Sequence, residues 1–561
     1  MPDTAPVKRP HLSVWPQYVP QRLDLPRTSV FENLAISARR HPDKPAFVCY
    51  DSPITYADLH RDATRLAGFL QQRCGVGKGD RVLLYAQNSI QFVVAYYAIL
   101  RADAVVVPLN PMNLTDELRR YAKDCAPKAA IAAQELWPRI EPLVANGTLE
   151  HVVVAAYKDY LGAPTALQVP DAFRMERQPI AGENVTLWSD ALAAGLEPRP
   201  HTAGPDDLCV MPYTSGTTGD PKGCMHTHRS VMHTLVAGSE WFRTLPEVVY
   251  LGVLPYFHVT GMQGSMNQPI YMGSTVVMLP RWDREAAGAL IARYKVQAWT
   301  LIPTMVVDLL ASPNAASFDF SSIQRMTGGG AAMPEAVATR LMEMCSIRFV
   351  EGYGLTETMA PSHINPPDRP KKQCLGIPIC DTDAMVVDPE TLAELPAGEV
   401  GEIVAAGPQI FTGYWGKPDA TKAAFFERDG RKYFRTGDLG RVDEEGYFFL
   451  VDRLKRMINA AGLKVWPAEV ESTLYGHPDI QEACVIATRD ARKGESVKAI
   501  VVLKPASRGK VAAQDIIAWA RSKMAAYKVP AVVVFEESLP KSATGKIQWR
   551  ALQEKEMGGA G

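Results

Sequence analysis

The chain has 561 residues, 47% of them hydrophobic, so it can bury a large core and is too long for one compact domain. Its 60 basic and 61 acidic residues nearly cancel, which disfavours a basic nucleic-acid-binding protein. No apolar stretch approaches the roughly 20 residues that cross a bilayer, and Met1–Pro16 lacks the apolar core of a secretory signal, so a cytoplasmic protein is expected.

Short apolar runs alternate with amphipathic segments through the N-terminal half of the chain. The run at Lys44–Tyr50 predicts a strand, and Thr55 then caps a helix with Asp58 as its capping-box partner. A helix is predicted at Ser89–Arg101. Further strands are predicted at Asp80–Ala86, Ala104–Leu109, Ala129–Ala133, His151–Ala156, Val249–Leu254, Thr275–Leu279 and Ala298–Ile302. This alternation predicts an α/β protein with mostly parallel sheets.

The segment Tyr213–Gly223 carries the clearest chemical signal. It follows an apolar run at Leu208–Met211 and combines glycines, small hydroxyl side chains and one lysine. Its glycines are Gly216, Gly219 and Gly223, and its hydroxyl donors are Thr214, Ser215, Thr217 and Thr218. Glycines let backbone N–H groups turn inward as a phosphate-binding nest, and Lys222 adds a positive charge. Because Lys222 follows a proline and precedes a glycine, the spacing is not that of the common P-loop.

Three later motifs carry groups that suit a nucleotide. In Glu351–Thr358, Tyr353 stands between glycines, which leaves its ring free to lie against a base, and Glu357 is able to hold Mg²⁺. The glycines of Thr327–Ala332 permit close approach of a ligand to the backbone. In Tyr433–Gly440, Asp438 can accept hydrogen bonds from ribose hydroxyls. Taken one at a time, each motif is also compatible with an ordinary turn.

The pattern of predicted strands and helices changes near Asp452–Lys455. Beyond that point, strands are predicted at Ala483–Ala487, Val497–Leu503 and Ala531–Phe535, with a helix at Ala512–Ala526. These elements predict a compact α+β unit, and the natural boundary separates residues 1–452 from residues 453–561. Nine cysteines without paired or Cys-x-x-Cys spacing favour buried thiols over a zinc site or a disulfide framework.

In this order, the motifs resemble the signatures of AMP-forming acyl-CoA synthetases, members of the adenylate-forming superfamily, over nearly the whole chain. The resemblance implies a large N-terminal domain of several subdomains (1–452) that binds ATP and the acyl substrate. It also implies a mobile C-terminal lid (453–561) that swings about a hinge at Lys455 and carries the catalytic lysine, Lys546, in Pro540–Lys546. The substrates and cofactors implied are a carboxylic acid, ATP, Mg²⁺ and coenzyme A.

The resemblance also assigns roles to individual residues. The catalytic residues are Lys546, Glu357, Lys222 and His258, the last as a gating histidine, and the metal ligands are Thr214 and Glu357. The nucleotide contacts are Thr214, Ser215, Gly216, Thr217, Thr218, Gly219, Gly330, Ala331, Glu351, Gly352, Tyr353, Gly354, Thr356, Asp438 and Arg453. The acyl pocket is lined by Phe257, Val259, Gly261, Met262, Gly329, Gly354, Met359 and Pro361.

The acid is expected to be neutral and apolar apart from its carboxylate. No Asp or Glu occupies Tyr256–Met262, where amino-acid-activating relatives place an aspartate for the substrate's ammonium. Because an unpaired ammonium is expensive to bury, amino acids are excluded. A medium- or long-chain fatty acid is the first expectation and an aryl acid the second. No tryptophan follows His258 as the tunnel gate of some long-chain members, so the chain length stays open.

The sequence thus predicts a ligase that forms acyl-AMP and pyrophosphate, then passes the acyl group to coenzyme A. Within enzymology, the alternatives are transfer to a separate carrier protein and an oxidative relative that consumes acyl-AMP with oxygen. A non-catalytic nucleotide sensor is the alternative of another class, and it predicts a missing catalytic group. All the groups assigned by the resemblance are present. No nucleic-acid partner is expected, and the patterns are compatible with a homodimer.

Overall fold

The computed structural model describes residues 9–215, 221–330, 333, 335–453, 456–460, 463–490, 494–542 and 547–558. The chain divides into two compact units. The large unit consists of His11–Asp383 and Ala405–Phe434, and the small unit is built from Ala384–Val404 and Arg435–Gly561. The small unit therefore includes residues that precede the boundary predicted at 452/453. That boundary, and the mobility of a lid, stay predictions.

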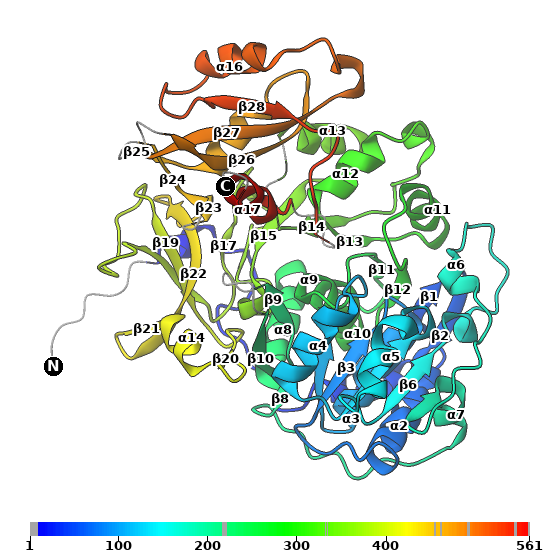
Figure 1. The fold of residues 1–561 in the computed structure, drawn as a ribbon. Helices are drawn as coiled ribbons and strands as arrows, with labels where there is room; N and C mark the ends of the chain where they lie inside the picture. Colours follow the sequence, from blue (N-terminus) through cyan, green and yellow to red (C-terminus); the bar gives the residue numbers. More distant parts are fainter. Residues whose placement is uncertain are drawn as a thin grey trace, which may run out of the picture. The chain divides into compact units, whose positions relative to one another are not determined.

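The described part of the large unit contains two mixed nine-stranded sheets. The first consists, in spatial order, of β17 (Ile377–Pro378), β16 (His363–Ile364), β15 (Phe349–Tyr353), β14 (Arg325–Gly328), β13 (Ala298–Leu301), β11 (Val249–Gly252), β12 (Thr275–Met278), β1 (Pro45–Cys49) and β2 (Ser52–Thr55). From β15 to β1 neighbouring strands are parallel, and antiparallel strands close both edges (Figure 1).

The second sheet carries the predicted phosphate segment at one edge. Its order is β20 (Gly413–Tyr414), β10 (Pro221–Thr227), β8 (Leu208–Val210), β4 (Val105–Pro108), β3 (Arg81–Tyr85), β5 (Ala129–Ala133), β6 (Val152–Ala155) and β7 (Val185–Leu187), with β9 (Tyr213–Ser215) paired to β10. The strands from β8 to β7 are parallel, whereas β10 is antiparallel to β8, β9 and β20.

Helices fill the connections of the large unit. They are α1 (Phe31–Arg40), α2 (Tyr56–Gln72), α3 (Ile90–Arg101), α4 (Thr115–Cys125), α5 (Trp137–Ala145), α6 (Asp171–Arg174), α7 (Trp188–Ala193), α8 (His228–Phe242), α9 (Val259–Met262), α10 (Gln268–Met272), α11 (Arg284–Tyr294), α12 (Pro303–Leu310), α13 (Glu335–Cys345) and α14 (Pro418–Ala423). Short 3₁₀ turns lie at Pro10–Val14, Gln134–Leu136, Tyr157–Tyr160, Ala315–Ser317 and Thr356–Thr358, and a π-helical turn lies at Gln263–Asn267.

Side-chain caps begin several of these helices. The predicted N-cap is confirmed, because Thr55 Oγ1 accepts the Asp58 N–H. The predicted partner Asp58 does contact Thr55, but its carboxylate accepts from the Thr55 hydroxyl in place of the backbone N–H of a capping box. Ser89 caps α3 and Thr227 caps α8 in the same way, each accepting the N–H three residues on. Helix α3 is apolar on almost all sides, and every residue from Ile90 to Leu100 is buried.

The small unit contains a sheet in the order β18 (Asp383–Val387), β19 (Gly401–Ala406) and β22 (Arg431–Val442), with β23 (Phe448–Arg453) paired to β22. The first residues of β22 belong to the large unit and pair there with β21 (Phe425–Arg428). A second sheet has the order β25 (Leu463–Val465), β24 (Ile458–Ala460), β27 (Gly494–Leu503) and β26 (Ile480–Asp490), with β28 (Val532–Phe535) parallel to β27. Its helices are α15 (Pro467–Leu474), α16 (Ala513–Arg521) and α17 (Trp549–Gly558), with a 3₁₀ turn at Pro505–Ser507.

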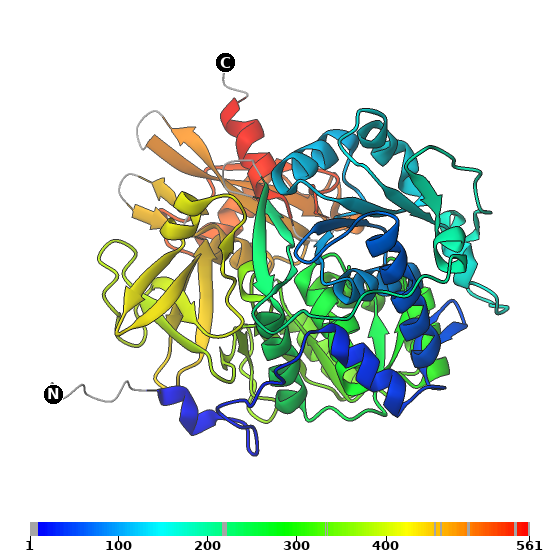
Figure 2. The same ribbon diagram turned by 90° about the horizontal axis from the view of Figure 1, so that it is seen from below.

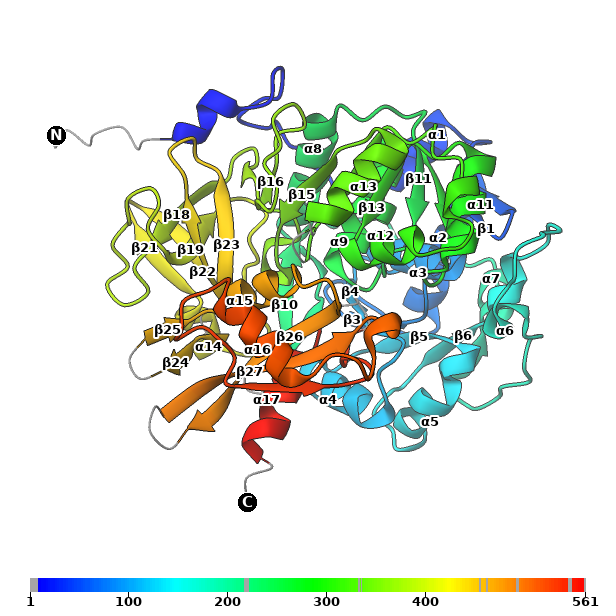
Figure 3. The same ribbon diagram turned by 90° about the horizontal axis from the view of Figure 1, so that it is seen from above.

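Alternating side chains give this second sheet two apolar faces. On β26, Ala483, Val485 and Ala487 join the core of α15 and α16, whereas Cys484 and Ile486 contact Trp549 and Leu552 of α17. The helices therefore cover opposite faces (Figures 1 and 3), and Figure 2 shows α17, in red, against the orange strands.

The strands predicted in the N-terminal half are confirmed, most of them a residue or two shorter at their ends. The helix predicted to reach Ala526 instead ends at Arg521. There the N–H groups of Ser522 and Lys523 donate to the carbonyls three residues earlier, as in a 3₁₀ turn, and the α-helix ends. Among the described residues, no helix combines the length and apolar character needed to traverse a bilayer.

Candidate functional site

The predicted phosphate segment is a β-hairpin in the large unit. Strands β9 and β10 pair antiparallel, so Thr214 lies directly opposite Lys222. A Cβ added at Gly223 would lie 2.9 Å from Met211 Sδ, so a larger residue there would displace the Met211 side chain. The hairpin thus holds the predicted metal-binding hydroxyl and the predicted phosphate-binding lysine side by side.

Several predicted site residues lie outside the described residues. They are Gly216, Thr217, Thr218 and Gly219 of the phosphate loop, Ala331 of the glycine-rich segment, the hinge Lys455 and the catalytic Lys546. The Ser215 side chain is also outside them. Their roles stay predictions.

Lys222 and Glu357 converge on a residue that sequence reasoning missed. The Lys222 ammonium lies 5.0 Å from the centre of the Tyr414 ring, and the Tyr414 hydroxyl donates to Glu357 Oε1 at 2.8 Å. The Phe411 N–H donates to the Glu357 carbonyl at 2.9 Å. Two predicted residues therefore meet across one side chain of β20, which pairs with β10 through Cys224 and Tyr414.

The turn Thr356–Thr358 is attached to β10 by a second missed residue, His226. His226 Nε2 lies 2.8 Å from the Thr356 carbonyl, and Nδ1 lies 3.2 Å from Ser230 Oγ. Burial lowers the pKa of His226 to about 4, so at neutral pH the ring is uncharged and donates from Nε2. The predicted metal ligand Glu357 and the predicted phosphate contact Thr356 thereby sit on a turn anchored from both sides.

The predicted base-stacking tyrosine is enclosed. Tyr353 on β15 is 8% exposed, and its ring meets the His363 ring edge-on at 5.7 Å. A Cβ at Gly354 would lie 2.9 Å from the Ala360 Cα, and one at Gly329 would lie 2.2 Å from the Gly352 carbonyl oxygen. Close approach of protein backbone therefore accounts for these glycines by itself.

Glu351, a predicted nucleotide contact, holds two backbone segments together. Its Oε1 accepts the Met333 N–H at 2.7 Å, and its Oε2 accepts the Cys374 N–H at 2.8 Å. Burial raises the pKa of Glu351 to about 7, although both N–H donors act in the opposite direction.

This pKa makes a testable contribution to stability. Because the folded value lies above the unfolded value of about 4.3, the contribution is complete below pH ~4 and is lost as pH rises through about 7. Between these two pKa values, the Glu351 carboxyl lowers the free energy of unfolding by up to about 1.4 kcal/mol for each unit that pH rises. We expect Glu351→Gln to abolish this pH dependence. Urea unfolding at pH 5, 6 and 7 measures the difference. The pH profile of the free energy of unfolding should be parallel to that of wild type in the exposed control Glu444→Gln. If the profile of Glu351→Gln is parallel as well, the raised pKa of Glu351 is contradicted.

The predicted gating histidine begins the short helix α9. His258 Nδ1 accepts the Thr260 N–H at 3.3 Å, so a neutral ring carries its proton on Nε2. Val259 and Met262 are buried, and a Cβ at Gly261 would lie 2.3 Å from the Pro255 carbonyl oxygen. Of the other predicted pocket residues, Met359 is fully buried, whereas Phe257 and Pro361 are partly exposed. Val259 and Met262 beside His258 are thus buried and apolar, and the acyl pocket itself stays a prediction.

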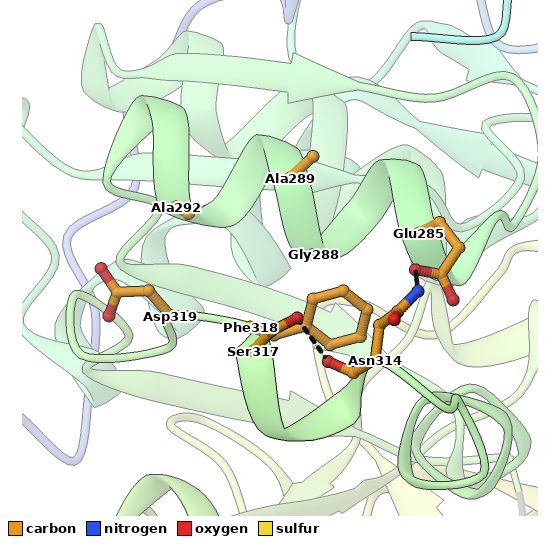
Figure 4. Close-up of a pocket in the computed structure, with 8 residues that line it drawn as sticks. All are labelled: Glu285, Gly288, Ala289, Ala292, Asn314, Ser317, Phe318 and Asp319. Atoms are coloured by element: carbon orange, nitrogen blue, oxygen red, sulfur yellow. Dashed lines mark hydrogen bonds between the residues drawn. The ribbon is translucent and has the colours of Figure 1, made fainter.

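A separate depression of about 260 Å³ lies between α11 and the turn at Ala315–Ser317 (Figure 4). Phe318 packs there against Gly288, where an added Cβ would lie 2.5 Å from its ring. None of the residues that line this depression belongs to the predicted site.

In the small unit, the two predicted ribose contacts form an ion pair. Asp438 and Arg453 are register partners on β22 and β23, with Arg453 Nε 3.0 Å from Asp438 Oδ1. Asp438 is buried, whereas the Arg453 side chain is half exposed. Thr436 Oγ1 accepts the Asp438 N–H, which fixes the strand backbone before the carboxylate. The pair presents an acceptor and a donor together, as recognition of a diol requires.

Comparison with known proteins places these motifs in a family context. The description "AMP-binding enzyme" matches residues 34–415, and "AMP-binding enzyme C-terminal domain" matches residues 469–546. A long-chain-fatty-acid–CoA ligase of Bacillus subtilis (strain 168) is 36% identical over 558 residues, 98% of each chain. A feruloyl-CoA synthase of Amycolatopsis sp is 35% identical over 517 residues, 91% of this chain and 95% of the relative. The crystal structure of ATP-bound MatB from Rhodopseudomonas palustris has a TM-score of 0.83 at 29% identity, covering 94% of this chain and 99% of that one.

Proposed function

The chain belongs to the AMP-binding enzyme family, and from this premise we infer that it activates an apolar carboxylic acid, in the first place a medium- or long-chain fatty acid. It is an AMP-forming acyl-CoA synthetase, a ligase that makes a carbon–sulfur bond. The observation that supports the substrate class is the segment Tyr256–Met262, which holds no carboxylate and in which Tyr256, Val259 and Met262 are buried. The similarity to a long-chain-fatty-acid–CoA ligase supports the same choice.

In the proposed first step, a carboxylate oxygen of the acid attacks the α-phosphorus of ATP, and the bond to pyrophosphate breaks. Two like unit charges about 4 Å apart cost about 4 kcal/mol at an effective dielectric of about 20. Lys222, the loop N–H groups and Lys546 would offset this repulsion where charge develops. No general base is required, because the acid is already ionised at neutral pH. In the second step, the coenzyme A thiol displaces AMP and forms the thioester.

The donor set around Glu357 suits Mg²⁺. Glu357 offers a carboxylate that Tyr414 orients, and Thr214 offers a hydroxyl opposite Lys222. Mg²⁺ prefers such oxygen ligands and usually takes the rest from water and substrate phosphates. Glu357 and Thr214 would hold the ion, and when bound it would neutralise phosphate charge.

A matched pair of acids tests the substrate class. We expect nonanoate to be converted with a kcat/KM at least about 10²-fold above that of 8-aminooctanoate, because burying an unpaired ammonium costs several kcal/mol. Coenzyme-A-dependent AMP production across fatty, aryl and amino acids is the measurement. A best substrate that carries an ammonium contradicts the proposal.

The same screen separates the alternatives. An aryl acid is the second candidate, supported by 35% identity to a feruloyl-CoA synthase, and ferulate would then outperform every fatty acid. Pyrophosphate release without thioester formation on coenzyme A would indicate transfer to a separate carrier protein. No pyrophosphate release with any acid would indicate a nucleotide sensor.

A further inference from the structure

We propose that Tyr414 is a positioning residue that holds the Glu357 carboxylate and the Lys222 ammonium in place for the magnesium nucleotide. The inference rests on the proposed functions of Lys222 and Glu357. Tyr414 would contact neither the carboxylate oxygen nor the α-phosphorus that react. It would act only through Lys222 and Glu357.

The geometry of the contact is specific at both ends of the tyrosine. At its tip, the hydroxyl donates to Glu357 Oε1 at 2.8 Å, within the range of a good O–H···O bond. At its face, the ring receives the Lys222 ammonium 5.0 Å from its centre, within cation–π range. One neutral side chain therefore contacts a carboxylate and an ammonium at the same time.

Strand register explains why Lys222 reaches this ring. Tyr414 of β20 lies opposite Cys224 of β10, and Lys222 is two residues before Cys224. The side chains of Tyr414 and Lys222 therefore project from the same face of the sheet. A diagonal neighbour at this offset is within reach of an aromatic ring and a long side chain. The contact therefore follows from how β10 and β20 pair.

The tyrosine itself is firmly held. Its N–H donates to Thr421 Oγ1 at 2.9 Å, and its ring meets the Phe411 ring edge-on at 4.8 Å. The flanking Trp415 N–H donates to the Gly223 carbonyl at 2.9 Å. A side chain fixed in this way can restrict the rotamers of Glu357, which a mobile one could not.

The Tyr414 hydroxyl has an O–H that can donate, and Glu357 offers only acceptors when it is ionised. At 2.8 Å, the bond between them orients one carboxylate oxygen of Glu357. Loss of that bond should weaken metal binding more than nucleotide binding.

The test compares Tyr414→Phe with a matched control, Tyr433→Phe. Tyr433 is also a buried tyrosine of the large unit whose hydroxyl donates to a carboxylate, Asp383 Oδ2 at 3.1 Å. It begins the motif Tyr433–Gly440, but no site role is assigned to it. Mn²⁺ serves as a paramagnetic probe, and its binding to the enzyme with ATP, without any acid, is followed by electron paramagnetic resonance. Thermal unfolding of all three proteins is recorded in parallel.

We expect Tyr414→Phe to weaken Mn²⁺ binding about 10-fold, the scale of one hydrogen bond to a charged group. ATP affinity in EDTA should change less than about 2-fold, and the Mg²⁺ concentration for half-maximal adenylation should rise in step with the Mn²⁺ constant. Tyr433→Phe should leave the metal affinity unchanged even where its melting temperature falls equally. Tyr414→Leu, which also removes the ring, should weaken ATP binding in EDTA as well.

The possible results distinguish failure of the Tyr414 role from failure of the proposed function. Wild-type Mn²⁺ affinity in Tyr414→Phe, with adenylation intact, overturns the role of Tyr414 and leaves the proposed function standing. An equal loss in Tyr414→Phe and Tyr433→Phe also overturns it, since a merely structural role then accounts for both. If wild-type enzyme binds no Mn²⁺ with ATP and adenylates no acid, the proposed function fails, and the role of Tyr414 fails with it.

Discussion

Replacing Lys546 with alanine is expected to slow acyl-AMP formation by about 10²–10³-fold or more, because it removes a cation proposed to act where charge develops on the α-phosphate. Thioester formation from supplied acyl-AMP should stay near the wild-type rate, since that step loses AMP and builds no new pyrophosphate charge. Pyrophosphate release measures the first step, and thioester formation from synthetic acyl-AMP measures the second.

Lys541 provides the control for this experiment. It lies five residues before Lys546 and forms an ion pair with Glu482 on the surface of the small unit. Lys541→Ala should leave both half-reactions within about 2-fold of wild type, because an exposed ion pair contributes little. An equal fall of both half-reactions in Lys546→Ala would contradict a lysine used for only one step.

Glu357→Gln is expected to lower adenylation by about 10²–10³-fold while preserving the fold. The amide keeps the shape of the side chain and can still accept the bond that Tyr414 donates to Glu357, but it loses the negative charge that Mg²⁺ requires. Rapid-quench measurement of pyrophosphate release over a range of Mg²⁺ concentrations is the assay.

Excess Mg²⁺ should not restore Glu357→Gln, in contrast to Tyr414→Phe, which keeps the charge and loses only its orientation. The exposed Glu427→Gln serves as the charge-matched control and should behave as wild type. Adenylation at the wild-type rate in Glu357→Gln would remove Glu357 from the metal site.

The residues that the sequence identified well are those whose chemistry is local. The capping pair Thr55 and Asp58 follows from three-residue spacing, and both hydrogen bonds are present. Thr214 and Lys222 lie opposite each other on β9 and β10, which pair over a short stretch of sequence, and their proposed roles stay predictions. The buried thiols of Cys209 and Cys224 likewise follow from the apolar runs around them.

Residues that act through distant partners escaped prediction. Tyr414 meets Glu357, 57 positions earlier, only because β20 pairs with β10 beside the turn at Thr356–Thr358. Glu351 was predicted as a nucleotide contact, but its hydrogen bonds to the Met333 and Cys374 N–H groups, and the burial that raises its pKa, were not predicted. No local sequence pattern predicts the partners of Tyr414 or Glu351.

By itself, the sequence determined the α/β class and the N-cap at Thr55, because the spacing of apolar residues and the chemistry of single side chains act over a few residues. The tertiary structure alone decided that Lys222 and Glu357 share Tyr414 and that Asp438 faces Arg453. It also decided that glycines such as Gly329 and Gly261 fit against neighbouring backbone. These depend on strand order and register, which arise when distant segments bury their apolar faces together.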